Sequence, residues 1–133
     1  MINVKYPLGE FERDDIRSKT GKKLDEITLD EVRRGNITSE DIKVSKETLR
    51  KQAEVARNAD NIEMAKNLER AAEMVDIPDH IILEMYNKLR PNRSTKAELL
   101  NMAEELRSKY QAENCAKLVL EAAEIYEKRG ILL

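Results

Sequence analysis

From Ser45 to about Arg129, the apolar residues of this chain recur every three or four positions, which is the spacing of one face of an α-helix. β-Branched residues are sparse there, and no segment alternates apolar and polar residues as a half-buried strand does. The pattern therefore predicts an all-α fold. Many apolar positions between residues 46 and 75 are alanines, which allow two helix axes to approach closely. We expect an antiparallel pair of helices that turns at residues 58–61.

Two further helical segments are predicted by their start signals. Pro78 suits the first position of a helix, because its missing N–H costs nothing there. Thr95 and Glu98 have the spacing of a capping box and predict the start of the next helix. The helical pattern from residue 95 to residue 129 is unusually long, so we place a kink or a break near residues 109–113. Whether this run is one kinked helix or two helices stays open.

The N-terminal third has a different character. Residues 1–23 show no sustained period and contain Pro7, Gly9 and Gly21, which predicts an extended arm. The next residues hold two similar segments, ITLDEVRRG and ITSEDIKV, which predict two short helical turns. In the first segment Thr28 and Glu31 fit a capping box, whereas in the second Thr38 and Asp41 only approximate one.

These observations together predict one structural domain. We expect an open up-and-down helical bundle over residues 45–133, preceded over residues 1–44 by an irregular N-terminal arm with short helical turns. Charged residues make up 38% of the 133 residues, and only five residues are aromatic, so the core should be thin.

The charge and hydropathy patterns exclude several classes of partner. The net charge is -2 with both signs interspersed, so no long basic stripe offers itself to a nucleic acid. No apolar segment approaches the roughly 20 residues that span a bilayer, so no membrane partner is expected. Cys115 is the only cysteine, which excludes an internal disulfide and is typical of a reducing compartment. We therefore expect a cytoplasmic protein.

Few residues are candidates for catalysis. His80 is the only histidine, so no bundle site with two histidine ligands can be built within one chain. Cys115 lies on the apolar side of its helix, where a buried, unreactive thiol is the common case. The four glycines are isolated and form no phosphate-binding loop. We predict no catalytic, cofactor-binding or metal-binding residue in this chain.

Two arginines flank the break between the third and fourth predicted helices. Arg90 and Arg93 could bond the carbonyl groups at the end of the third helix, a usual role for cations near a helix C-terminus. They could instead reach carboxylates of another protein, because arginine is enriched at interfaces and Tyr86 lies one turn before Arg90. Composition and spacing leave both interpretations open.

At this point the sequence resembles a known family. The segments YPL, GKKLDEITLDEV, NLERAAE and ILEMYNKLRPNRSTKAELL are similar to those of the small, or gamma, subunit of adenosylcobalamin-dependent diol and glycerol dehydratases. The similarity extends from about Tyr6 to Arg129. It implies an all-helical chain with an irregular N-terminal portion, which docks on the large subunit of a larger enzyme.

The resemblance also implies partners and a cofactor. Large (alpha) and medium (beta) subunits assemble with the small subunit as a dimer of heterotrimers, and the complex converts glycerol, 1,2-propanediol or ethanediol to the aldehyde by a radical mechanism. Adenosylcobalamin is bound by the other subunits, so this chain is expected to be a non-catalytic, structural part of a lyase. The alternative from a different class is a free-standing helical adaptor without enzymatic role.

The resemblance selects candidate interface residues and reveals one departure from the family pattern. We expect contacts with the large subunit at Tyr6, Pro7, Leu8, Tyr86, Arg90 and Arg93. Relatives packaged in bacterial microcompartments often carry a longer extension before the YPL element, and only MINVK precedes it here. Encapsulation through this subunit is therefore not expected. The preferred diol is determined in another chain.

Overall fold

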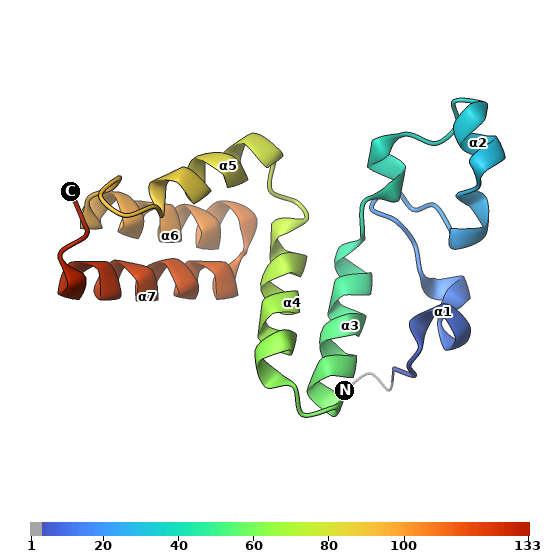
Figure 1. The fold of residues 1–133 in the computed structure, drawn as a ribbon, viewed down its shortest axis with the longest axis horizontal. Coiled ribbons are helices and arrows are strands. Elements are labelled where there is room, and N and C mark those ends of the chain that lie inside the picture. The colour runs from blue at the N-terminus through green and yellow to red at the C-terminus, as the bar shows by residue number, and fades with distance from the viewer. Residues whose placement is uncertain (1–3) are drawn as a thin grey trace. The chain divides into compact units, whose positions relative to one another are not determined.

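The computed structural model of the chain describes residues 4–133, and it contains helices and turns but no named strand within that range (Figure 1). The predicted all-α class is confirmed. Two compact units are present, one ending at Val75 and the other covering Asp76–Leu133. The predicted boundary after residue 44 falls inside the first unit, and the single structural domain stays a prediction. No helix among residues 4–133 is long and apolar enough to cross a bilayer.

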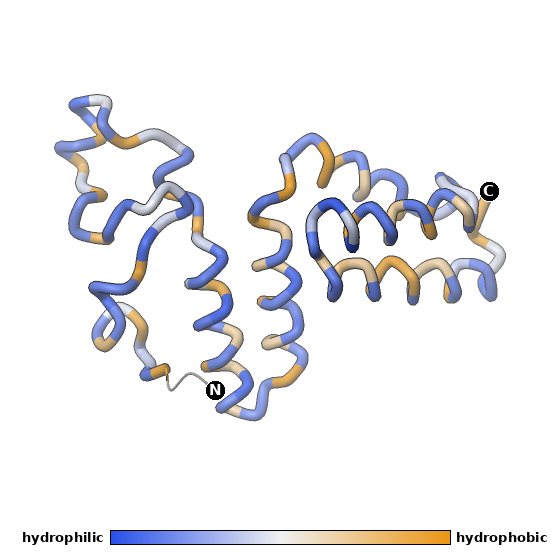
Figure 2. The backbone as a smooth tube through the Cα atoms, turned by 180° about the vertical axis from the view of Figure 1, so that it is seen from behind, coloured by the Kyte–Doolittle hydropathy of each residue, from blue (hydrophilic) through white to orange (hydrophobic). Residues whose placement is uncertain are grey.

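The first unit is built on an antiparallel pair of helices, α3 (Lys46–Asn58) and α4 (Ile62–Met74). Ser45 begins α3, since its Oγ accepts the N–H of Thr48 at 3.1 Å. The buried side chains along the pair are mainly small, among them Ala53, Ala65 and Ala72. Hydrophobic residues are spaced along both helices rather than forming continuous runs (Figure 2). The predicted alanine-rich pair is thus confirmed.

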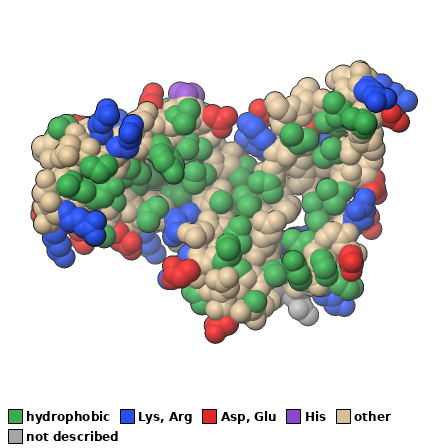
Figure 3. Space-filling model, in the orientation of Figure 1, with side chains coloured by type: hydrophobic (Ala, Val, Ile, Leu, Met, Phe, Trp, Pro, Cys, Tyr) green, Lys and Arg blue, Asp and Glu red, His purple; other side chains and the backbone are tan. Residues whose placement is uncertain are grey.

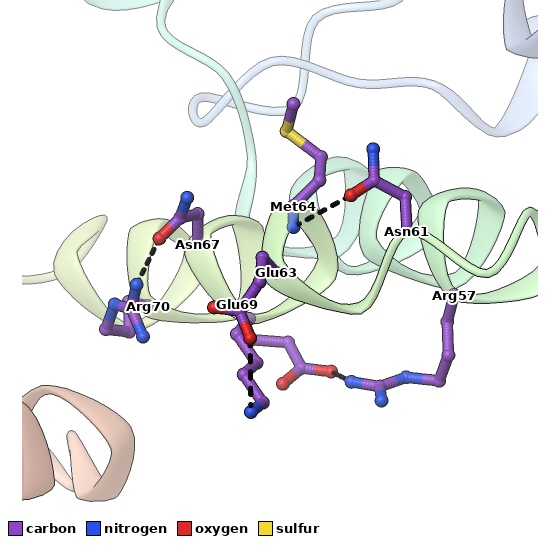
Figure 4. A network of polar contacts seen from close by, with 8 residues as sticks. Arg57, Asn61, Glu63, Met64, Asn67, Glu69 and Arg70 are labelled. Carbon is purple, nitrogen blue, oxygen red and sulfur yellow. Dashed lines mark hydrogen bonds and ion pairs between the residues drawn. The ribbon is translucent and has the colours of Figure 1, made fainter.

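Polar side chains tie α3 to α4 near their connection (Figure 4). Arg57 of α3 forms an ion pair with Glu69 of α4. Asn61 begins α4 by accepting the N–H of Met64 at 3.3 Å. Asp60 takes a positive φ of 60° in the turn itself, a conformation that Asp tolerates better than most residues. The turn at residues 58–61 lies where the sequence predicts it.

Residues 4–23 form an irregular arm with short helical turns, as predicted, although they are not extended throughout. A short helix, α1 (Leu8–Phe11), is followed by the 3₁₀ turn η1 (Arg13–Asp15). Pro7 has φ of -76°, close to the value its ring imposes, and its carbonyl accepts the N–H groups of Glu10 and Phe11 at 3.1 and 3.2 Å. A proline at a helix start is as compatible with helix as with an arm, which is why composition alone misled.

The two predicted helical turns are present, but the full capping box forms in the second turn rather than in the first. They are α2 (Leu29–Arg33) and the 3₁₀ turn η3 (Ser39–Ile42), and a further 3₁₀ turn, η2 (Leu24–Glu26), precedes them. Thr28 does cap α2, but the carboxylate of Glu31 bonds Arg34 and Asn36 at 2.8 and 2.7 Å instead of closing a box.

Asp41 makes the reciprocal bond that Glu31 was expected to make. Its Oδ2 accepts the backbone N–H of Thr38 at 2.8 Å, so the better capping box is in the second segment. The Oδ1 of Asp41 accepts the hydroxyl of Thr20 at 2.7 Å. One buried carboxylate therefore joins η3 to a turn 21 residues earlier in the chain.

The second unit is built on the antiparallel pair α6 (Lys96–Tyr110) and α7 (Glu113–Arg129). Thr95 begins α6 as predicted, because its Oγ1 accepts the N–H of Glu98 at 3.2 Å. The predicted break is confirmed as a full turn in which Gln111 has a positive φ of 52°. The core consists of apolar side chains from both helices: Leu99, Met102, Ala103, Leu106, Cys115, Ala116, Val119 and Ala123.

Helix α5 (Asp79–Lys88) precedes this pair and differs from it in packing. Pro78 is its N-cap rather than its first residue, a displacement of one position from the prediction. None of the ten residues of α5 is buried, although half of them are apolar or aromatic. Fully buried apolar side chains therefore do not hold this helix in place.

Candidate docking surface on helix α5

Helix α5 has two unlike faces. Ile82, Met85 and Leu89 lie at helical spacing on one side and are half-buried. Leu83 and Tyr86 lie on the other side and are 64% and 71% exposed. Arg90 directly follows the C-cap residue Leu89 and is exposed. We call Leu83, Tyr86, Arg90 and the following Arg93 the outer face of α5.

Hydrogen bonds from side chains hold the C-terminal end of α5. The hydroxyl of Tyr126, on α7, donates to the carbonyl oxygen of Leu89 at 2.6 Å. The hydroxyl of Ser94 donates to the carbonyl oxygen of Lys88 at 2.8 Å. The final carbonyls of a helix lack partners within the helix, so these two bonds satisfy groups that would otherwise need water. They also fix the end of α5 relative to α6 and α7.

The loop after α5 is held by the end of the chain. The backbone N–H of Asn92 donates to the carbonyl oxygen of Ile131 at 2.8 Å, and the N–H of Leu133 donates to that of Ser94 at 2.9 Å. Arg93 lies between these two bonded residues. Its backbone is therefore fixed from both sides, while its side chain is exposed.

Neither Arg90 nor Arg93 has a carboxylate or carbonyl partner for its guanidinium group among residues 4–133. The carbonyls of Lys88 and Leu89, which the capping interpretation would give to the arginines, accept hydroxyl groups instead. The capping interpretation is thus not supported. Two unpaired cations beside an exposed leucine and tyrosine have the composition of an interface, where arginine and aromatic residues are enriched.

The six predicted interface residues fall into two groups. Tyr86 lies on α5, with Arg90 and Arg93 in the loop that follows, whereas Tyr6, Pro7 and Leu8 lie at the start of α1 in the other unit. Tyr6 and Pro7 are exposed and Leu8 is half-buried. That these residues contact another subunit stays a prediction.

Sequence reasoning missed Leu83, Ser94 and Tyr126. Leu83 could have been found from its spacing of three and seven residues before Tyr86 and Arg90. Ser94 and Tyr126 carry no local signal, because each acts on a carbonyl group that is distant in sequence: six residues for Ser94 and 37 for Tyr126.

The candidates for catalysis are placed as the sequence predicts. His80 is exposed in the first turn of α5, and Cys115 is buried on α7. Within the part of the chain that the structure describes, no three His, Cys, Asp or Glu side chains lie where they could hold one metal ion.

The arrangement is suited to binding a protein surface. In the space-filling view, hydrophobic side chains gather over the second unit, with Lys and Arg side chains near their edge (Figure 3). An exposed apolar centre beside fixed cations offers both burial and charge pairing to a partner. The outer face of α5 is the candidate functional site.

Comparisons with known proteins identify the family of the chain. The family model described as "Dehydratase small subunit" matches residues 1–133. The propanediol dehydratase small subunit of Citrobacter freundii is 46% identical over 124 residues, which are 93% of this chain and 72% of that relative. The propanediol dehydratase small subunit of Salmonella typhimurium has the same identity and coverage. The chain therefore belongs to the dehydratase small-subunit family.

Proposed function

We propose that this chain is the structural small subunit of an adenosylcobalamin-dependent dehydratase that converts 1,2-propanediol, glycerol or ethanediol to the aldehyde. The names of the two relatives support the diol class of substrate. The observation that carries the structural role is the outer face of α5, where exposed Leu83 and Tyr86 are followed by two arginines whose guanidinium groups have no partner among residues 4–133. In this proposal the large subunit covers that face.

The charges on the outer face determine what the partner must provide. A guanidinium group that loses its water on docking requires carboxylate or carbonyl acceptors, and its planar fork favours a carboxylate. We therefore expect acidic residues of the large subunit opposite Arg90 and Arg93, around an apolar surface that receives Leu83 and Tyr86. Tyr6, Pro7 and Leu8 provide further contacts. Large, medium and small subunits then assemble as a dimer of heterotrimers.

Catalysis and cobalamin binding belong to the other subunits in this proposal. Adenosylcobalamin would supply radical chemistry when bound. The one imidazole here, His80, is exposed on a short helix that buries no residue, which does not fit an enclosed cofactor site. This chain's own contribution is to position and stabilise the catalytic subunits.

A cytoplasmic location is part of the proposal. Cys115 is the only cysteine of the chain, so its buried thiol forms no disulfide within the chain. Chains that mature in oxidising compartments more often use cysteines in pairs as disulfides.

Charge reversal of the outer face tests the proposed function. Arg90→Glu with Arg93→Glu should weaken binding to the purified large subunit by about 2 to 5 kcal/mol, because the partner's carboxylates would lose their cations and meet like charges. The dissociation constant can be measured by calorimetry. The matched control is Arg50→Glu with Lys117→Glu, which reverses two exposed, unpaired cations on α3 and α7.

The control separates docking from net charge, since both double variants change the charge equally. Equal binding by the two variants would contradict the assignment of the outer face. If the Arg90 and Arg93 variant loses helicity by circular dichroism while its folded fraction binds normally, the arginines stabilise the helix end and do not dock.

A further inference from the structure

Four cations lie within seven residues of the N-terminal unit. Arg17, Lys19, Lys22 and Lys23 occur with no acidic residue between Ile16 and Leu24. The segment folds back on itself: the N–H of Ser18 donates to the carbonyl of Lys22, and the N–H of Gly21 to that of Ser18, both at 2.9 Å. We call residues 17–23 the basic turn.

The fold places like charges opposite one another in the basic turn. Arg17 and Lys23 form an isolated antiparallel bridge, so their side chains start from facing positions. The N–H of Lys19 donates to the carbonyl oxygen of Lys43 at 2.8 Å, and the ammonium group of Lys43 forms an ion pair with Glu40 at 3.0 Å. Like charges directly opposite across a bridge are destabilising. The structure therefore maintains a concentration of positive charge that its own stability does not require.

Acidic residues of the chain neutralise only part of this charge. Lys19 and Lys23 make no ion pair among residues 4–133, and the guanidinium of Arg17 bonds the carbonyl oxygen of Gly21 at 3.2 Å. Asp41 is the acid nearest the turn in the hydrogen-bond network, but it is buried, and its oxygens accept Thr20 and Thr38. Asp41 fixes the position of the turn and attracts Lys22, whereas Lys19 and Lys23 are exposed and remain available to a partner.

Exposed apolar side chains adjoin the basic turn. Ile42 is 65% exposed and Val44 is 43% exposed. Val44 forms an isolated antiparallel bridge with Ser18, so the backbone that carries Val44 and Ile42 adjoins the basic turn. A polyanion such as a nucleic acid backbone offers phosphates but little apolar surface to cover isoleucine and valine. A protein segment can provide both carboxylates and an apolar side chain.

We propose that the basic turn, with Ile42 and Val44, is a second docking surface, and that its occupant is an acidic segment of another dehydratase subunit that also presents an apolar side chain. This inference rests on the proposed function. It assigns one docking surface to each compact unit of the chain, with the outer face of α5 on the second. Attachment through two linked surfaces makes the second contact intramolecular and raises the overall affinity beyond that of either alone.

Charge reversal of the turn tests the inference in the full chain. We compare Lys19→Glu with Lys23→Glu against the control Arg50→Glu with Lys117→Glu, and measure the dissociation constant for the co-purified large and medium subunits. The turn variant should bind at least about tenfold more weakly at about 50 mM salt, and the difference should shrink at about 300 mM as screening increases. The control should stay within about threefold of the unmodified chain. Ile42→Ala should weaken binding without altering this salt dependence.

The two lysines contribute backbone rather than side-chain bonds to the turn, so the reversal should leave the fold intact. If circular dichroism shows that it does not, Lys19→Ala with Lys23→Ala removes the cations without adding like-sign repulsion to the partner.

The possible outcomes distinguish this inference from the proposed function. Equal binding by the turn variant and the control overturns the second surface and leaves the proposed function standing. Failure of the unmodified chain to bind the other subunits overturns both. Unchanged subunit binding together with lost affinity for single-stranded DNA in the turn variant would show that the turn binds polyanions, which also overturns the inference.

Discussion

Removing the hydroxyl groups that hold α5 should loosen this helix selectively. The perturbation is Tyr126→Phe with Ser94→Ala, which deletes the bonds to the carbonyls of Leu89 and Lys88 at 2.6 and 2.8 Å. A typical intramolecular hydrogen bond contributes about 0.5 to 1.5 kcal/mol net. The two bonds together therefore stabilise α5 against local unfolding by about 1 to 3 kcal/mol. Because α5 buries no residue, little apolar contact replaces this contribution. The structure therefore predicts a local effect.

Native-state hydrogen exchange measures that effect. Amides of residues 83–89 should exchange about 5- to 150-fold faster in the double variant, since 1.4 kcal/mol corresponds to a factor of ten. Amides in the middle of α6, such as those of Leu99 and Ala103, should change much less. Tyr110→Phe is the matched control, because the Tyr110 hydroxyl makes no hydrogen bond among the described residues.

Two results would refute the reasoning. Unchanged exchange in α5 would mean that the half-buried side chains, and not the hydroxyl groups, hold the helix in place. Equal acceleration in α5 and in the core of α6 would mean that the second unit opens only as a whole, so that α5 has no separate opening equilibrium.

Three further predictions concern the core, acid stability and catalysis. Leu99→Ala removes a side chain with 0% exposure and should lower the free energy of unfolding by about 2 to 5 kcal/mol in urea titrations. The hydrogen bond from Thr20, then that from the Thr38 backbone, lowers the pKa of Asp41 below its ordinary value of 3.8. The ionised Asp41 therefore stabilises the N-terminal turns at pH values above 3.8, and this stabilisation is lost as the pH falls through the lowered pKa. Protection of the backbone amides in these turns from hydrogen exchange should be retained at about pH 5 and lost in stronger acid. Asp41→Asn should abolish this pH dependence. His80→Gln with Cys115→Ala should leave turnover per assembled complex within about twofold, and a hundredfold loss would reveal a misassigned catalytic residue.

Local signals in the sequence predicted most of the helix starts. Ser45 and Thr95 begin their helices as expected, because a cap depends on residues only three positions away. The capping boxes show where this reasoning fails, because Asp41 closes one and Glu31 does not. Both acids have the correct spacing, so other hydrogen-bond partners decide between them. The carboxylate of Glu31 accepts the side-chain amide of Asn36 instead, whereas Asp41 also accepts the hydroxyl of Thr20 from a distant turn.

The break at Gln111 was located from length alone. A run of 35 residues is too long for one helix in a small unit, but glutamine is not a residue that signals a left-handed turn. The conformation could therefore not be predicted from the residue. The same limit applies to the docking surface, where Arg90 and Tyr86 have recognisable chemistry but the hydroxyl groups that position them are identified only by the fold.

The alanine contact between α3 and α4 has a consequence for how this unit tolerates mutation. Ala65 has 0% exposure, and Ala53 and Ala72 are nearly as enclosed. Every residue except glycine is larger than alanine, so almost any change at these positions adds atoms where two helices already touch, at a typical cost of about 1 to 3 kcal/mol. Glycine itself costs about 1 kcal/mol inside a helix. Random substitution can thus only weaken this contact, and we expect saturation mutagenesis scored by folding to show these three positions as the most restrictive in the first unit.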